Sequence, residues 1–289
     1  MAVPKVVLVT GSSEGGIGAG LCEAFLKQGC RVFASARRLE SMKGLEKQGC
    51  DLVQLDVCDE ASIKKCVESV VAKAGRIDIL VNNAGVGLIG PLMDLPIDSV
   101  RNLFETNVYG VIAMSQAVFP VMAKQGGGTI ANIGSIAGWL TTPWGAAYCA
   151  SKAAIQSLTD GMRMEMKPFG IDVVLIQPGA IKSNLGKNNA ERLYFEEEGR
   201  YKPFGDAIRA RVAFSQQPGA TPTDEFAEKA VATILKTSPP AHWFYGKHSW
   251  TVYILSNFFP IWIQDWMLGR QFNLSAKLPL KKGEGRKTE

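Results

Sequence analysis

The stretch Val6-Val7-Leu8-Val9-Thr10-Gly11-Ser12-Ser13-Glu14-Gly15-Gly16-Ile17-Gly18 joins a short apolar run to a glycine-rich segment. The apolar run predicts a strand that is buried on both faces, as in a parallel sheet covered by helices. Helical periodicity follows over Ile17–Lys27, and Gly29 predicts the end of that helix. A glycine turn between a strand and a helix is typical of a site for the pyrophosphate of a dinucleotide. A glycine-rich turn without a ligand is the alternative.

Strands and helices alternate along the rest of the chain. Further strands are predicted at Arg31–Ala36, 52–55, 77–81, 129–133, 171–176 and His242–Tyr245, with helices near 63–71, 99–123, 148–166 and 225–235. This alternation predicts an α/β fold with a Rossmann-type, doubly wound parallel sheet in a single domain. We place the dinucleotide-binding catalytic domain at residues 1–246, a hydrophobic and aromatic C-terminal arm at 247–276, and a basic tail, expected to be disordered, at 277–289.

The composition argues against several classes of protein. The 289 residues carry a net charge of +5, and residues 277–289, with five basic and two acidic side chains, account for +3 of it. The small charge of the body predicts no nucleic-acid binding. The six cysteines form no CxxC pair, and no secretory leader precedes the first strand. We therefore expect reduced thiols, a cytoplasmic protein and no metal site.

The end of the second predicted strand bears on the choice of cofactor. NAD-selective folds carry an acid near this point to hold the ribose 2′-hydroxyl, and Ala34-Ser35-Ala36-Arg37-Arg38 contains none. Arg37 and Arg38 would instead pair with a 2′-phosphate, which favours NADP(H), whereas two solvated surface arginines are the alternative. Asp56 and Val57 follow the third strand, where we expect the adenine ring, unless Asp56 merely caps a turn.

The segment Tyr148-Cys149-Ala150-Ser151-Lys152 places a phenol and an amine four residues apart. On a helix this spacing puts both side chains on one face. An ammonium beside a phenol favours the phenolate, so we expect a lowered pKa for Tyr148. Such a tyrosine can exchange a proton with an alcohol or a ketone near neutral pH.

Taken together, these motifs resemble the short-chain dehydrogenase/reductase family over roughly residues 5–245. The matching segments, in order, are the glycine motif at 11–18, Asn82-Asn83-Ala84-Gly85, Asn107, Ser135, and Tyr148 with Lys152. The thirteen-residue separation of Ser135 from Tyr148 is also similar to that of the family. Two features depart from it: the glycine motif is one residue longer than TGxxxGxG, and Ser183 stands where the family often has threonine.

The resemblance implies a role for each matching residue. Tyr148 is the general acid in reduction, Lys152 lowers its pKa and hydrogen-bonds the nicotinamide ribose, and Ser135 donates to the substrate oxygen. Asn107 interrupts its helix and holds a water in a proton relay, or else is a satisfied polar residue of the core. The implied cofactor-binding residues are Gly11, Ser13, Gly16, Ile17, Gly18, Arg37, Arg38, Asp56, Val57, Asn83, Ala84, Gly85, Tyr148, Lys152, Pro178, Gly179, Ile181 and Ser183.

Bulky side chains near Ser135 bear on the substrate. We assign Trp139, Trp144 and Tyr194 to the substrate site, together with Ser135, and expect a substrate with a large apolar part. Core packing is the alternative for either tryptophan. Residues 182–211 correspond to the mobile lid of the family and contain Arg192, Arg200, Arg209 and Arg211. These arginines would meet a phosphate-bearing substrate or form a solvated helix face.

Residues 249–263 are uncharged and aromatic. As one helix they would span roughly 22 Å, short of the ~30 Å of a bilayer core, and Pro260 would interrupt it. We therefore expect no transmembrane span. Insertion into a membrane interface, with the basic tail near anionic lipid, and packing on protein are the two alternatives.

Within the family, Ala36-Arg37-Arg38-Leu39-Glu40, Glu165-Met166-Lys167-Pro168-Phe169 and the C-terminal extension are similar to 1-acyldihydroxyacetone-phosphate reductases. This resemblance implies NADPH-dependent reduction of a lipid ketone, giving 1-acylglycerol 3-phosphate, on the cytosolic face of the endoplasmic reticulum or on lipid droplets. A hydroxysteroid or retinol dehydrogenase is the alternative enzyme. A non-catalytic dinucleotide-binding scaffold at a membrane is the alternative from another class. The family also implies a homo-oligomer.

Overall fold

A parallel β-sheet forms the centre of the molecule. The computed structural model describes residues 3–274, apart from the side chains of 185, 187 and 188. Its strands are β1 (Val6–Thr10), β2 (Arg31–Ala36), β3 (Asp51–Gln54), β4 (Ile79–Asn82), β5 (Gly128–Ile133), β6 (Ile171–Pro178) and β7 (His242–Tyr245). They lie in the order β3-β2-β1-β4-β5-β6-β7, and neighbours pair in parallel. The predicted single-domain, doubly wound α/β fold is confirmed.

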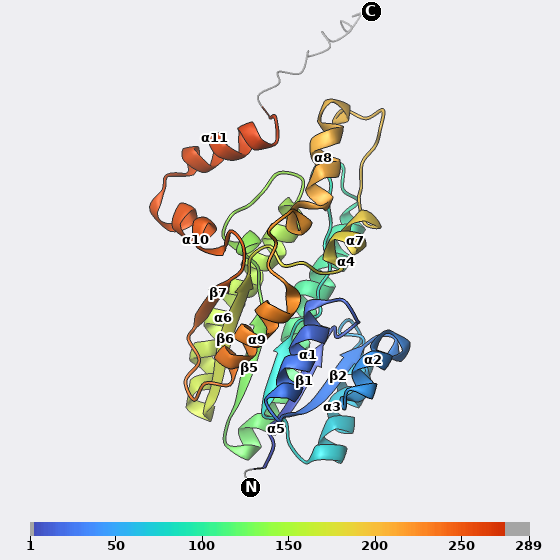
Figure 1. The fold of residues 1–289 in the computed structure, drawn as a ribbon, viewed down its shortest axis with the longest axis vertical. Helices are drawn as coiled ribbons and strands as arrows, with labels where there is room; N and C mark the ends of the chain where they lie inside the picture. Colours follow the sequence, from blue (N-terminus) through green and yellow to red (C-terminus); the bar gives the residue numbers. More distant parts are fainter. Residues whose placement is uncertain (1–2, 275–289) are drawn as a thin grey trace, which may run out of the picture.

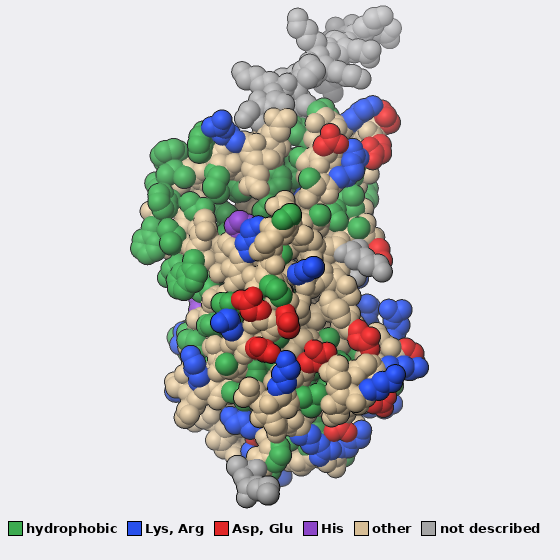
Figure 2. Space-filling model, in the orientation of Figure 1, with side chains coloured by type: hydrophobic (Ala, Val, Ile, Leu, Met, Phe, Trp, Pro, Cys, Tyr) green, Lys and Arg blue, Asp and Glu red, His purple; other side chains and the backbone are tan. Residues whose placement is uncertain are grey.

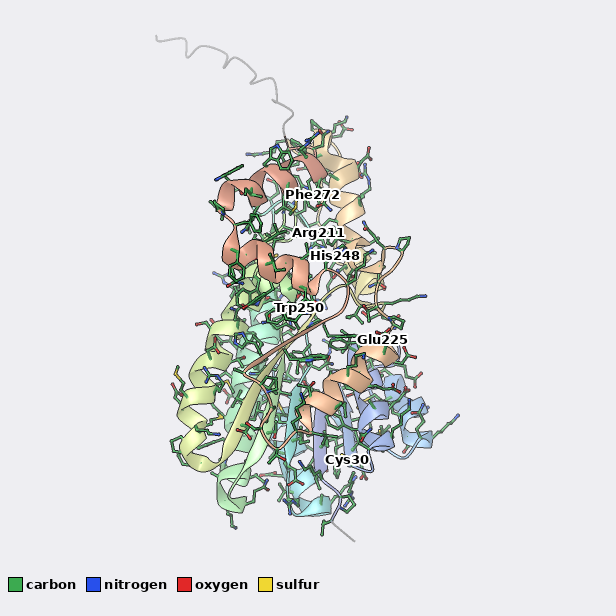
Figure 3. The ribbon with its side chains drawn as sticks, turned by 60° about the vertical axis from the view of Figure 1, so that its left-hand side comes forward. Cys30, Arg211, Glu225, His248, Trp250 and Phe272 are labelled. Carbon is green, nitrogen blue, oxygen red and sulfur yellow. The ribbon has the colours of Figure 1, made fainter. Side chains whose placement is uncertain are left out.

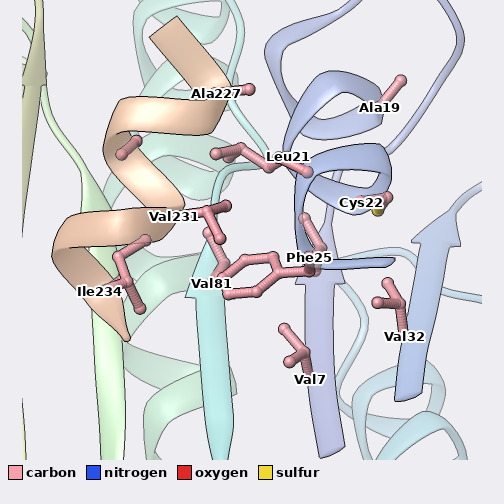
Figure 4. Packing of buried hydrophobic residues seen from close by; sticks show 14 of the residues in the cluster. Val7, Ala19, Leu21, Cys22, Phe25, Val32, Val81, Ala227, Val231 and Ile234 are labelled. Carbon is pink, nitrogen blue, oxygen red and sulfur yellow. The ribbon is translucent and has the colours of Figure 1, made fainter. Parts of the chain in front are cut away.

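Helices cover both faces of the sheet (Figure 1). The helices of the body are α1 (Ile17–Lys27), α2 (Lys43–Lys47), α3 (Glu60–Ala74), α4 (Ile97–Phe104), α5 (Gly110–Gln125), α6 (Ala146–Met166) and α9 (Thr223–Ile234). Buried side chains of α1 and α9 pack on one face, and those of α3 and α5 pack on the other. Figure 4 shows Phe25 of α1 and Val231 of α9 above Val7 and Val81 of the central strands. The central strands are mostly apolar because both of their faces are covered.

The strand order reverses between β1 and β4, and this reversal positions the site. β2 and β3 lie on one side of β1, whereas β4 and the later strands lie on its other side. In an open parallel sheet, loops at the carboxyl ends of the strands diverge at such a point and leave room for a ligand. The glycine turn follows β1, and Asn83 directly follows β4, so both lie at this reversal.

Four helices lie beyond the carboxyl edge of the sheet, namely α7 (Leu185–Ala190), α8 (Gly205–Val212), α10 (Ser249–Phe258) and α11 (Ile261–Gln271). An apolar cluster joins α8, α10 and α11 to the loop before α6; its buried residues include Trp144, Phe204, Ile208, Val252, Leu268 and Phe272. Pro260 separates α10 from α11, as the sequence predicted. Between residues 3 and 274, no helix has the length and apolarity required to cross a bilayer. The predicted tail, 277–289, and residues 275–276 of the predicted arm lie outside the described residues.

Candidate active site

The turn between β1 and α1 leaves no space for side chains at two of its glycines. Gly11 has a φ of +69°, and a Cβ there would lie 2.7 Å from the Cα of Ala84. A Cβ at Gly18 would lie 2.4 Å from the Nδ2 of Asn83. Gly16 is the N-cap of α1 and makes no side-chain bond to the helix, so the first amides, from Ile17 on, have no side-chain acceptor. Uncapped amides at a helix N-terminus fit a phosphate group, and this turn therefore fits a dinucleotide.

The segment after β4 holds the glycine turn in place. The side-chain amide of Asn83 donates to the carbonyls of Thr10 at 2.8 Å and Gly11 at 3.0 Å. The hydroxyl of Thr10 accepts the N–H groups of Asn83 and Ala84, each at 3.0 Å. The Asn83 side chain thus shapes the turn, which is a role that sequence reasoning did not assign to it.

The additional residue of the glycine motif contacts a distant loop. Gly15 has a φ of +74°, and its carbonyl accepts the N–H of Asn184 at 3.0 Å. The side chain of Asn184 donates to the carbonyl of Glu14 at 2.9 Å. On the other side of the turn, the hydroxyls of Ser13 and Ser41 lie 3.1 Å apart. Sequence reasoning missed Asn184, because no local motif marks a residue whose partners lie 170 positions away.

The residues predicted to meet the adenosine half lie after β2 and β3. Arg37 and Arg38 are exposed directly beyond β2, and no acidic residue lies between the end of β2 and Glu40. An Oδ atom of Asp56 accepts the N–H of Cys58 at 3.0 Å, which is the turn-capping alternative left open by the sequence. Val57 is buried. Basic side chains without a neighbouring acid suit a ribose 2′-phosphate better than a free 2′-hydroxyl.

The segment after β6 follows the last predicted cofactor residues. Pro178 ends β6, and the N–H of Gly179 donates to the carbonyl of Tyr245 at 2.8 Å. Ile181 is buried, and the N–H of Ser183 donates to the side chain of Gln216 at 3.1 Å. Hydrogen bonds to β7 and to Gln216 therefore fix the backbone that leads from the sheet to segment 182–211.

Ser135 and Tyr148 lie together at the carboxyl ends of the strands. Ser135 follows β5, and its Oγ accepts the N–H of Ala137 at 3.1 Å. The Ser135 side chain also lies near enough to the Tyr148 phenol to act on its pKa. Burial raises the pKa of Tyr148, while the Ser135 hydrogen bond and the positive charge of Arg211 act to lower it. The spacing in the sequence predicted a lowered pKa, and this was wrong for the structure, because desolvation of the phenolate dominates.

Lys152 lies one turn along α6 from Tyr148. Its Nζ is 5.9 Å from the centroid of the Tyr148 ring and donates to the carbonyl of Ile133 at 2.8 Å. Burial lowers the pKa of Lys152 to about 8, because removal from water penalises the ammonium. A Cβ at Gly85 would lie 3.7 Å from the same Nζ. Lys152 thus borders the loop after β4 as well as the phenol.

Asn107 lies in a π-helical turn, Glu105–Tyr109, which interrupts the helix between α4 and α5 as the resemblance implied. Its side chain accepts the N–H of Val86 at 2.8 Å and donates to the carbonyl of Val86 at 2.9 Å. The same amide donates to the hydroxyl of Ser151 at 3.0 Å, and Ser151 donates to the carbonyl of Tyr148 at 2.7 Å. Asn107 therefore ties the loop after β4 to the helix that carries Tyr148 and Lys152.

The three predicted substrate aromatics have different surroundings. The indole N–H of Trp139 donates to Gln177 at 2.7 Å, and its ring packs against Phe244 and Tyr253. Trp144 is buried against Tyr201 and Phe204, with a left-handed φ of +64°. Tyr194 is 41% exposed and donates its N–H to the carbonyl of Ile89. These contacts fit the packing alternative for Trp139 and place Trp144 against the lid segment. Within residues 3–274 no group of three or more potential ligand side chains is placed to hold a metal.

A doubly wound parallel sheet with a glycine turn at its reversal point, and a serine, tyrosine and lysine beside it, defines a nicotinamide-dinucleotide-dependent oxidoreductase. A family model described as short chain dehydrogenase matches residues 5–193. The chain therefore belongs to the short-chain dehydrogenase/reductase family and is an oxidoreductase of that family.

Curated relatives and solved structures agree with this assignment. A short-chain dehydrogenase/reductase of Pestalotiopsis microspora is 35% identical over 243 residues, which cover 83% of this chain and 84% of that protein. A short-chain dehydrogenase of Hypocrea virens is 36% identical and is matched over 93% of each chain. A short-chain dehydrogenase from Streptomyces avermitilis superposes with a TM-score of 0.78 at 29% identity, covering 96% of this chain and all of that one. A serine dehydrogenase in complex with NADP+ gives a TM-score of 0.72 at 27% identity, covering 83% and 94%.

Proposed function

We propose that this protein reduces a ketone on an apolar or lipid substrate, with NADPH as the reductant. The observation that carries the reaction type is the placement of Ser135, whose Oγ is fixed by the N–H of Ala137, near enough to Tyr148 to act on the pKa of its phenol. Tyr148 protonates the oxygen of the developing alkoxide, and Ser135 donates to the same oxygen. The bound cofactor supplies the hydride to the carbonyl carbon. Asn107 acts as a positioning residue for α6, and Lys152 binds the nicotinamide ribose.

The preference for NADPH follows from the end of β2. Arg37 and Arg38 are exposed there without a neighbouring acid, which suits a 2′-phosphate. The similar serine dehydrogenase was solved with NADP+. The uncapped N-terminus of α1 would hold the pyrophosphate. We propose that the cofactor-binding residues predicted from the sequence hold NADP(H). The Asn83 side chain contributes indirectly, because it shapes the glycine turn.

The substrate class follows from the apolar cluster beyond the sheet. Trp144, just before α6, packs in one buried cluster with Phe204 and Ile208 of segment 182–211, so the region beside the start of α6 is apolar. A carbonyl carried on a long apolar body is the chemistry that such a lining favours. Within that class, 1-acyldihydroxyacetone phosphate is our single best candidate, because it joins an acyl chain to a ketone.

Substrate assays test this proposal directly. We expect the protein to consume NADPH faster than NADH with 1-acyldihydroxyacetone phosphate, and Tyr148→Phe to lose turnover by about 10²-fold or more while it still binds NADP+. A preference for steroid or retinoid substrates in the same assay would favour the alternative enzyme. If none of the ketones promotes NADPH oxidation, the non-catalytic scaffold is the better description. Retained turnover in Tyr148→Phe would reject Tyr148 as the acid.

We further propose that the arm, 247–276, docks the enzyme on a lipid surface such as the cytosolic face of the endoplasmic reticulum or a lipid droplet. Its outward residues include Trp250, Phe258, Ile261, Trp262 and Trp266, each at least 60% exposed. Figure 2 shows hydrophobic side chains gathered over α10 and α11. Exposed tryptophans suit the headgroup region of a membrane, and the basic tail that follows in the sequence suits anionic lipid.

Vesicle sedimentation tests the docking proposal. We expect Ile261→Glu/Trp262→Glu to abolish binding to vesicles that contain phosphatidylserine. The control is Phe169→Glu, because Phe169 is also exposed but follows α6 away from the arm. Unchanged sedimentation of the double variant would reject the arm as the membrane contact. A double variant that instead converts a dimer to a monomer would show that a second copy of the chain covers this face.

A further inference from the structure

Arg211 is a buried arginine that has no acidic partner among residues 3–274. It lies in α8 and is 8% exposed, and its Nε donates to the hydroxyl of Thr142 at 3.1 Å. Arg209, two residues earlier on the same helix, pairs instead with Glu197 at 2.6 Å and Asp206 at 3.3 Å. A guanidinium remains charged in proteins, so its burial without a counter-charge is unfavourable.

The position of Arg211 makes the burial of its charge still less favourable. A Cβ at Gly145 would lie 3.1 Å from an Nη of Arg211, so the guanidinium reaches the start of α6. Gly145 is the N-cap of α6 and makes no side-chain bond to its first turn. The N-terminus of a helix carries a partial positive charge, which disfavours a cation and favours an anion. Two features that attract negative charge therefore meet at one place, and no protein carboxylate within the described part of the chain satisfies them.

An apolar cluster adjoins Arg211. Its guanidinium carbon lies 5.1 Å from the centroid of the Phe214 ring, and Phe214 packs against the cluster that contains Ile208 and Phe204. The titratable groups that face it are the phenol of Tyr148 and the thiol of Cys149. Tyr148 lies in the first turn of α6, next to Gly145, and the charge of Arg211 acts to lower its pKa. Figure 3 shows Arg211 in the upper part of the molecule, beyond the sheet.

We propose that Arg211 and the uncapped first turn of α6 form a subsite for an anionic group, a carboxylate or a phosphate, on the otherwise apolar substrate. The subsite deepens the proposed function, because it lies beside Tyr148 and specifies which apolar ketones are accepted. Bidentate binding by the guanidinium would fix the orientation of the substrate, with the apolar chain along the cluster that contains Trp144 and Phe204. A single arginine, rather than all four of the lid segment, thus confers the specificity.

Calorimetric titration of the NADP+-loaded protein tests the subsite without relying on turnover. The probes are octanoate, octyl phosphate and 1-octanol, which share one chain and differ in charge and headgroup. We expect one of the anions to bind at least about tenfold more tightly than the alcohol, and the preferred headgroup identifies the anion. In Arg211→Gln this preference should fall to within about twofold, whereas Arg209→Gln, the matched variant on α8, should retain it.

Two further variants keep the test decisive if Arg211→Gln fails to fold. Arg211→Lys retains the charge and loses the planar fork, so it should keep a reduced preference. Gly145→Ala places a methyl group against the guanidinium, so it should weaken binding of the anions without affecting binding of the alcohol. Equal binding of the anions and the alcohol by the wild-type protein, or a preference that survives Arg211→Gln or Gly145→Ala, would overturn the subsite. A failure of ketone reduction alone would leave this preference in place, so the two proposals fail separately.

Discussion

At the scale of single residues, opposing influences act on the pKa of Tyr148. Burial raises the pKa of the phenol, whereas the hydrogen bond from Ser135 and the charge of Arg211 stabilise the phenolate. A raised pKa keeps the phenol protonated, which is the form that an acid catalyst for ketone reduction requires. In the proposed mechanism Ser135 has two effects, since it would stabilise negative charge on the substrate oxygen and it limits how far burial raises the phenol pKa.

Replacing Ser135 by alanine should expose both effects. We expect kcat/KM for ketone reduction to fall about 10²- to 10³-fold, because a donor to the developing oxyanion is lost. The pH above which reduction declines should move upward, because the lost hydrogen bond had favoured the phenolate. Ser135→Thr keeps a hydroxyl and is the matched control. A decline that moves to lower pH in Ser135→Ala would contradict the assignment of Tyr148 as the titrating acid.

Lys152 should leave a signature in the stability of the protein. Its pKa is about 8 in the folded state, below the ordinary lysine value of 10.5, so the unfolded chain binds more protons between these values. The stability of the wild type relative to Lys152→Met should therefore rise as the pH increases from 8 towards 10.5. Between pH 7 and pH 10 the gain should reach roughly 2–3 kcal/mol. Chemical denaturation of both proteins at several pH values measures it, and a difference that is independent of pH would show that Lys152 is not desolvated.

At the scale of elements, the glycine turn depends on close contact between two loops. A Cβ at Gly18 would lie 2.4 Å from the Nδ2 of Asn83 and 2.5 Å from the carbonyl of Gly11. Gly18→Ala should therefore lower the free energy of unfolding by roughly 1–3 kcal/mol and weaken NADP+ binding. Gly161→Ala is the matched control, because Gly161 lies inside α6 and a Cβ there meets nothing within 4 Å. That control should be stabilised by roughly 0.5–1 kcal/mol, and an equal loss in both variants would refute steric exclusion at the turn.

Most elements could be predicted from the sequence because their signals are local. Apolar runs such as Val6–Thr10 and the helical periodicity of Ile17–Lys27 reflect burial on two faces and on one face respectively. The interruption at Asn107 came from the resemblance, whereas periodicity alone indicates one continuous helix over 99–123. The bond between Asn184 and Glu14 could not be predicted, since it joins loops that only the finished sheet brings together.

At the scale of the whole molecule, burial separates residues that look alike in the sequence. Arg209 and Arg211 lie two positions apart in one helix, yet Arg209 is ion-paired at the surface and Arg211 is buried against the start of α6. Likewise, the raised pKa of Tyr148 results from its burial, which cannot be predicted from the four-residue spacing to Lys152. Sequence motifs predicted which groups to expect at the site, whereas the tertiary structure determines how their pKa values are shifted.

Because α8 and α11 share the apolar cluster beyond the sheet, we expect the two helices to unfold as one cooperative unit. Leu268 of α11 is buried in the same cluster as Ile208 of α8, whereas Trp262, also in α11, is 64% exposed. Leu268→Ala should lower the free energy of unfolding by about 2 kcal/mol, and Trp262→Ala should lower it by less than about 0.5 kcal/mol. Hydrogen exchange should show faster exchange in both α8 and α11 of Leu268→Ala, with β1 and β4 unchanged, because the cluster opens without the sheet. If α8 kept its protection while α11 lost it, α11 would open independently of α8, and the two helices would not form one cooperative unit.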